Sequence, residues 1–203
     1  MLLEHCYRRQ MRKRLLNKDF TLLSNNCWGG GIYEDLGLPY RTPTVGLFFH
    51  GPCYIKLLKN LRFYMSCELS FIEISKYKLA NEKREISKSQ YPIGLIGDVE
   101  VHFLHYHSSD EAIEKWNRRR SRINYSNLFL ELGEIELVSY DVMVEFDELD
   151  YKNKVLFSTE EHSHLKSVVA LTKRKGKMDI GDLYTNKMIW RKEFDVVEWL
   201  NKG

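Results

Sequence analysis

The stretch from Phe20 to Leu38, FTLLSNNCWGGGIYEDLGL, places two amides, a thiol and an indole beside three glycines. An apolar run, a polar turn and a segment of helical period predict a strand followed by a helix. Asn and Ser cap the free N–H groups of a first helical turn, and those groups can also hold a phosphate or carboxylate. Since one capping amide would suffice, the second amide and the glycines favour a ligand-binding wall. The candidate ligand-binding residues here are Ser24, Asn25, Asn26, Trp28, Gly29 and Gly30.

Two alternatives remain open at this junction. Trp28 either stacks on the face of a sugar ring or packs on a neighbouring element below a well-capped helix. Cys27 is a possible nucleophile, but no feature of the sequence indicates a lowered thiol pKa, so a neighbouring or buried thiol is the simpler interpretation.

A second stretch, GDVEVHFLHYHSS, begins at Gly97 and alternates polar with apolar residues. In a strand, one face carries Asp98, Glu100 and His102, and the other carries Phe103, His105 and His107. Carboxylates beside an imidazole suit acid–base catalysis, so His105 is the candidate general base, with Glu100 or Asp98 as the alternative. The simplest role for His102 is structural. No metal site is expected, because His102 points away from the other two histidines.

The segment SSDEAIEKWNRRRSRIN predicts a helix whose buried stripe passes through Trp116. Arg119 falls on or beside this stripe, whereas Arg122 lies on the far side. A guanidinium directed inward needs a carboxylate or phosphate partner, so we expect Arg119 to be buried and paired with Asp98 or Glu100. Alternatively, the arginines complement the helix C-terminus. A structural role is favoured over phosphate pairing, since this helix end lies opposite the carboxyl ends of the strands.

These residues need a scaffold, and apolar runs of strand length alternate with helical segments. The predicted strands are Phe20–Ser24, Thr44–Phe49, Ser70–Ile74, Val99–Tyr106, Asn127–Leu132, Lys154–Ser158 and Ser167–Thr172. Helices are expected near 3–17, 29–37, 53–67, 109–123, 140–149 and 187–201. The alternation predicts a single-domain α/β three-layer sandwich with a largely parallel sheet, or a mixed one if Tyr91–Gly97 forms a hairpin across Gly97-Asp98.

In such sheets, ligands bind outside the carboxyl ends of the strands. The polar turn after the first predicted strand, His50 after the second and His105 after the fourth would then share one edge. We therefore expect Asn25, Asn26 and His105 to line one concave pocket.

Composition describes an ordinary globular chain of 203 residues with a net charge of +3, which does not call for a nucleic-acid partner. The four cysteines show no metal-like spacing and suit a reducing, cytoplasmic setting. Residues 1–18 hold six basic side chains and one acidic one, and Leu3, Tyr7, Met11 and Leu15 recur every four residues. This basic amphipathic helix either lies on the inner face of an anionic membrane as a peripheral contact or docks on the sheet.

Three blocks, FTLLSNNCWGGGIYEDLGLPYRTPTVGLFF, GDVEVHFLHYHSSDEAIEKWNRRRSRIN and YKNKVLFS, together resemble an uncharacterised bacterial family. It is a domain of unknown function often labelled exopolysaccharide biosynthesis protein. The resemblance covers nearly the whole chain and implies an α/β fold and association with capsule or exopolysaccharide gene clusters, sometimes alongside glycosyltransferases. It supplies no established catalytic residue.

The sequence thus leads to the expectation of a cytoplasmic protein of exopolysaccharide or capsule biosynthesis. Its expected activity is transfer from a nucleotide sugar or sugar phosphate, and no cofactor is expected, since no D-x-D-like motif is present. One alternative is a non-catalytic accessory protein that docks on a membrane-associated glycosyltransferase through residues 1–18. Another is a hydrolase or acyl-transfer enzyme that uses Cys27 with a histidine.

Overall fold

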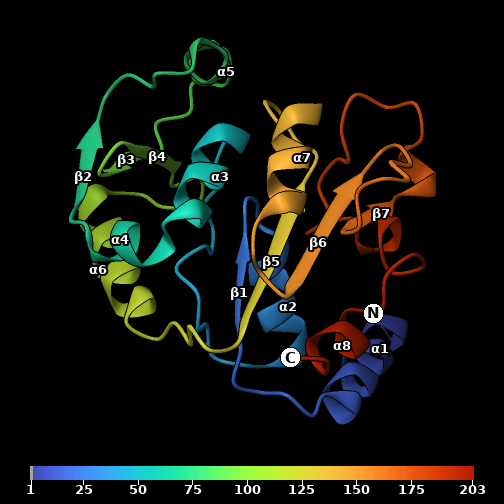
Figure 1. The fold of residues 1–203 in the computed structure, drawn as a ribbon. Helices are drawn as coiled ribbons and strands as arrows, with labels where there is room; N and C mark the ends of the chain where they lie inside the picture. Colours follow the sequence, from blue (N-terminus) through green and yellow to red (C-terminus); the bar gives the residue numbers. More distant parts are fainter. Residues whose placement is uncertain (1) are drawn as a thin grey trace.

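The structure, a computed structural model, describes residues 2–203, with side chains from residue 4 onward. Its centre is a four-stranded sheet in which every neighbouring pair is parallel (Figure 1). The strand order is β1 (Thr21–Ser24), β5 (Leu128–Gly133), β6 (Asn153–Ser158) and β7 (Val168–Ala170). The predicted α/β architecture is therefore confirmed.

Helices cover both faces of this sheet. Successive side chains of each strand point to opposite faces, so apolar side chains meet helices on either side. Leu23 and Leu130 pack toward α3 (Gly51–Lys59) and α7 (Tyr140–Glu148), whereas Leu22 and Phe129 pack toward α1 (Leu2–Arg14), α2 (Trp28–Leu36) and α8 (Val196–Leu200). Strands buried on both faces read as continuous apolar runs. This explains why the sequence indicated them clearly.

A second sheet is antiparallel and holds β2 (Leu69–Ile72), β3 (Ile93–Ile96) and β4 (Val99–His102). The predicted hairpin forms, and Gly97 takes the left-handed φ of 60° that its two-residue turn requires. The structure corrects one expectation here, because β4 belongs to this separate sheet and not to the parallel one. α6 (Ser109–Arg120) follows, capped by the Ser108 side chain.

The predicted strand Thr44–Phe49 is wrong. This segment is irregular and makes one bridge, between Phe48 and His102, because Gly46 adopts a left-handed φ of 71° that no strand allows. The predicted helix 53–67 divides at Asn60 into α3 and α4 (Leu61–Ser66). The predicted helix 187–201 contains only the short turn η2 (Lys187–Ile189) and α8, and a further turn, η1 (Thr172–Arg174), precedes them.

Helix α5 (Lys78–Ser87) was not predicted from the sequence. Ala80 is its one buried residue, so it lacks the apolar stripe by which an amphipathic helix is recognised. In Figure 1 it lies at the edge of the molecule, beyond the smaller sheet.

Helix α1 docks on the protein, as one of the two alternatives expected. Met11 and Leu15, from the apolar stripe, are buried against α2 and the C-terminal region. Asp35 on α2 is fully buried and pairs with Arg8 of α1 and with Arg191. Among residues 2–203, no helix combines the length and apolar character needed to cross a membrane.

Candidate functional site

The two amides after β1 are engaged within the protein. Asn25 is fully buried and clamps β1 to β5, since its Nδ2 donates to Gly133 O over 3.0 Å and its Oδ1 accepts from Gly133 N over 2.8 Å. Asn26 Oδ1 accepts from Trp28 N over 2.8 Å and so caps α2. Both side chains therefore hold the strand edge together, and neither leaves its carbonyl oxygen free for a ligand.

A buried acid, Glu131 on β5, completes this network. Its Oε1 accepts from Asn26 Nδ2 over 3.1 Å, while burial raises the pKa of Glu131 to about 8. Ser24 contributes to the pKa of Glu131, but Glu131 Oε2 and Ser24 Oγ have no hydrogen-bond partner of good geometry among the described residues. A protonated Glu131 carries no charge, which reduces the cost of its burial. In the sequence, the signal for this site is a lone charge inside the apolar run LFLELG, which was not among the predicted site residues.

Trp28 and the glycines that follow it are explained by packing. Trp28 is 1% exposed, and its ring lies 5.2 Å from Phe157 and 5.5 Å from Trp190, so it offers no face to a sugar. A Cβ on Gly29 would lie 2.4 Å from Ser24 Oγ, and one on Gly30 would lie 3.3 Å from a methyl of Val45. Trp28 therefore packs in the aromatic core, and the expectation that it stacks on a ligand is wrong.

His105 meets this junction in a small cavity of about 200 Å³, whose lining residues are Cys27, Gly30, Glu34, Val45, Gly46, His105 and Tyr184. Asn25 and Asn26 are not among them, so the expectation that His105 shares a pocket with both amides is wrong. The cause is the return of the loop after β4 beside Gly46, where His105 N donates to Gly46 O. Burial raises the pKa of Cys27 to about 11, which leaves a protonated thiol and gives no support to a nucleophile.

Asp98 and Glu100 do not act together. Asp98 stands at the tip of the β3–β4 hairpin, where it pairs with Lys56 and accepts from Tyr64 Oη over 3.0 Å. Glu100 is buried on β4. Of these two candidate carboxylates, only Glu100 lies in the protein interior beside other titratable side chains.

Arg119 is 8% exposed, in agreement with its expected burial. However, it donates to Tyr106 Oη over 2.6 Å and to Val45 O over 3.3 Å, and its guanidinium lies 4.9 Å from the centre of the Tyr40 ring. The predicted carboxylate partner is therefore wrong, because aromatic and carbonyl groups take that place. Arg122 is directed to Tyr40 O at 3.5 Å on the surface.

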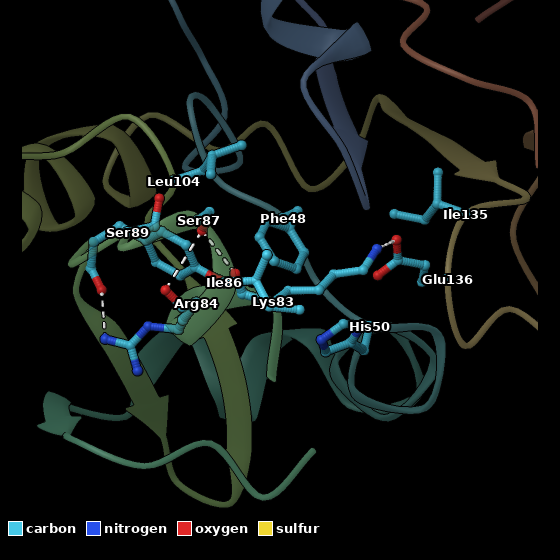
Figure 2. Close-up of a pocket in the computed structure, with 11 residues that line it drawn as sticks. Phe48, His50, Lys83, Arg84, Ile86, Ser87, Ser89, Leu104, Ile135 and Glu136 are labelled. Carbon is cyan, nitrogen blue, oxygen red and sulfur yellow. Dashed lines mark hydrogen bonds and ion pairs between the residues drawn. The ribbon is translucent and has the colours of Figure 1, made fainter. Parts of the chain in front are cut away.

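A second cavity, of about 670 Å³ and so the larger of the two, lies between α5 and the carboxyl end of β5 (Figure 2). Apolar side chains form much of its wall, and Lys83 crosses from α5 to pair with Glu136. The lining residues are Phe48, His50, Lys83, Arg84, Ile86, Ser87, Ser89, Tyr91, Leu104, Ile135 and Glu136. This volume is typical of small-molecule sites.

His50 lies in the wall of this cavity, directly before α3. It is 2% exposed, and both ring nitrogens lack a hydrogen-bond partner among the described residues. Burial, with a smaller contribution from His102, lowers the pKa of His50 to about 4. A neutral imidazole with both nitrogens unused is unusual in a protein interior, where polar groups are normally paired. Its lone pair accepts no hydrogen bond from the described residues, and neither ring nitrogen is exposed to solvent.

A buried carboxylate stands behind His50. The ring centres of His50 and His102 are 4.9 Å apart, and His102 Nε2 lies 2.7 Å from Glu100 Oε1, although off the direction of a good hydrogen bond. Burial opposes ionisation of Glu100, but interactions with His102, Ser75 and the Lys76 N–H outweigh it and lower its pKa to about 2. The negative charge of Glu100 therefore faces two imidazoles.

Several further contacts fix this cluster in place. Phe48 stacks on His102 with ring centres 4.5 Å apart, and Tyr77 lies 4.5 Å from His50. Cys53 Sγ accepts from Glu100 N and from Tyr77 Oη, each over 3.2 Å. The sequence placed His50 at a strand end without indicating a chemical role for it, and it favoured a structural role for His102.

Among the described residues, no three His, Cys, Asp or Glu side chains gather as a metal site would need. The arrangement is suited instead to moving a proton at His50, with Lys83 and Arg84 able to attract an anion. This cavity is therefore the candidate functional site.

Comparison with known proteins places the chain in a family. A family model described as domain of unknown function (DUF1919) matches residues 2–201. An uncharacterised protein of Haemophilus influenzae is 32% identical over 197 residues, which cover 95% of this chain and 89% of that protein. The chain therefore belongs to the DUF1919 family.

Proposed function

We propose that this protein is a transferase of bacterial exopolysaccharide or capsule biosynthesis, and that the larger cavity binds a sugar phosphate or nucleotide sugar. The observation that carries the proposal is the neutral, unpaired His50 in the wall of a cavity that also presents Lys83 and Arg84. The pathway rests on the resemblance to a family that bears the exopolysaccharide label.

In the proposed reaction, a hydroxyl of the acceptor lies against a ring nitrogen of His50. As its oxygen forms a bond to the transferred group, the hydroxyl proton passes to His50, and the bond from that group to the phosphate breaks. The negative charge of Glu100 stabilises the imidazolium of His50 electrostatically. Lys83 stabilises the negative charge that develops on the departing phosphate.

Ligand binding is tested first by thermal shift with nucleoside diphosphates, nucleotide sugars and sugar phosphates. A ligand that binds only the native state adds about 2.7 kcal/mol of stability at a hundredfold excess over its dissociation constant. A panel in which no compound raises the melting temperature would contradict the proposal.

The role of His50 is tested with His50→Leu. Both ring nitrogens are buried and unpaired, so an apolar replacement should leave the melting temperature unchanged or raise it. Turnover of the ligand found in the panel should fall by about 100-fold or more. His105→Gln, at the exposed histidine of the small cavity, is the matched control and should retain activity. Loss of turnover in His105→Gln alone would transfer the role to that histidine.

The accessory-protein alternative has less support. Docking through the apolar face of α1 would require Met11 and Leu15, which are already buried. The exposed basic residues Arg9 and Lys13 remain, so Arg9→Glu with Lys13→Glu would abolish co-purification with a glycosyltransferase if this alternative holds.

A further inference from the structure

The mouth of the larger cavity carries apolar side chains in contact with solvent. Ile86 is 83% exposed and Leu104 is 40% exposed, and both also line the cavity. Figure 2 shows them on one side of Phe48, with His50 and Ile135 on the other. An apolar surface that runs from a cavity wall to its mouth is a feature of binding sites.

The opposite wall is held by a strained turn. Leu137 adopts a left-handed φ of 60°, which is rare for a residue other than glycine, and its side chain is 39% exposed. Its backbone packs so closely on α3 that a Cβ on Gly51 would lie 2.5 Å from Leu137 O. This turn places Ile135 and Glu136 in the cavity wall, and such strain gathers at functional sites.

Two polar side chains of the lining are already engaged within the protein. Ser87 Oγ donates to Lys83 O over 2.7 Å, and Arg84 donates to Glu73 O over 2.9 Å and to Tyr91 O over 3.3 Å. The groups suited to one anion are the Lys83 ammonium, now paired with Glu136, the Nε of Arg84, which has no partner among the described residues, and His50.

We propose that the larger cavity binds an anionic amphiphile, a phosphate that carries an aliphatic chain. The phosphate replaces Glu136 as the partner of Lys83 and lies near His50, and the chain follows Phe48 and Ile135 out across the mouth. This inference rests on the proposed function, because it specifies what is attached to the phosphate of the substrate in the same cavity.

Octyl phosphate is the probe, and isothermal titration of the full-length protein measures its affinity. Inorganic phosphate and octanol each supply half of the proposed ligand. We expect octyl phosphate to bind at least about tenfold more tightly than either, because each buried methylene contributes to affinity. Equal affinity for octyl phosphate and inorganic phosphate would overturn the inference.

Two exposed isoleucines provide a matched pair of variants. Ile86→Asp places a charge in the path of the chain and should weaken octyl phosphate binding by about tenfold or more. Ile74 is 74% exposed but does not line the cavity, so Ile74→Asp should bind like the wild type. Unchanged affinity in Ile86→Asp, or an equal loss in both variants, would contradict the proposed path.

Two further measurements identify the source of the phosphate and distinguish failure of this inference from failure of the proposed function. Sedimentation with vesicles of phosphatidylcholine plus phosphatidic acid, but not with phosphatidylcholine alone, would identify a lipid surface as the source of the phosphate. Octyl phosphate binding without sedimentation would identify a free amphiphile. If glucose 1-phosphate or UDP-glucose binds and octyl phosphate does not, this inference fails while the proposed function stands. If none of them binds, both fail.

Discussion

Glu131 gives the protein a dependence of stability on pH that can be worked out from the structure. Its carboxyl is fully buried beside Ser24 and Asn26, and burial raises its pKa from 4.5 to about 8. Between these two values, the native protein holds a proton that the unfolded chain has lost. Unfolding then releases a proton, so the free energy of unfolding falls as the pH rises through this window.

The size of the effect follows from the same two values. Each pH unit between 4.5 and about 8 costs up to about 1.4 kcal/mol, and the whole window corresponds to on the order of 4 kcal/mol. Glu131→Gln removes the titration and keeps the shape, because the amide oxygen can accept from Asn26 Nδ2 as Glu131 Oε1 does. The variant should match the wild type near pH 5 and be the more stable of the two at pH 8.

Urea unfolding of both proteins at pH 5, 6, 7 and 8 measures this difference. Glu68→Gln, at an exposed position, controls for the loss of one carboxyl. A difference between Glu131→Gln and the wild type that does not change with pH would refute a proton held by Glu131. A wild type that becomes more stable than the variant as the pH rises would show that the buried carboxylate is ionised and paired.

Three further outcomes are expected. Asp35→Asn should lower the free energy of unfolding by about 1–3 kcal/mol, because Arg191, 7% exposed in its side chain, would lose one of its two carboxylate partners and keep Glu4. Thermal unfolding measures this, and an unchanged melting temperature would contradict it. Arg119→Met should cost only about 1–3 kcal/mol in urea unfolding, since it breaks bonds to Tyr106 and a carbonyl but strands no carboxylate, and a larger loss would point to a carboxylate partner after all. The turnover rate should stay constant down to about pH 5 and fall near pH 4 as His50 gains a proton, whereas a fall near pH 6.5 would exclude His50 as the base.

The sequence predicted the strands of the parallel sheet and the β3–β4 hairpin, but it assigned β4 to the parallel sheet and predicted a strand at Thr44–Phe49. Strands β1, β5 and β6 are largely buried between helices, and β7 is partly buried at the sheet edge, so each appears as an apolar run whose limits lie within two residues of those predicted. The run Thr44–Phe49 has the same composition but no strand. Its apolar character reflects burial of a loop, since Leu47 and Phe49 are fully buried, and a pattern of residue types cannot separate these two cases.

The candidate site could be predicted from the sequence only in part, for a related reason. The sequence indicated a chemical role for Glu100, but it indicated none for His50 and favoured a structural role for His102. The amides after β1 are of the residue type that also binds ligands. Their actual partners, Gly133 and Glu131, are more than 100 positions away, so their use as structural clamps depends on the pairing of β1 with β5. Likewise, His50 gains its chemical interest from having no partner among the described residues, which no local pattern can reveal.

The candidate site lies beyond the carboxyl end of a parallel strand, as the rule for such sheets predicts, but that strand is β5 and not β1. The edge beyond β1 is closed by Asn25 and leaves only the small cavity next to His105. The edge beyond β5 continues into Ile135 and Glu136, which face α5 across the larger cavity. Helix α5 has little buried surface of its own, and its ion pair from Lys83 to Glu136 spans the opening. The one helix that the sequence pattern did not predict therefore forms one wall of the candidate site.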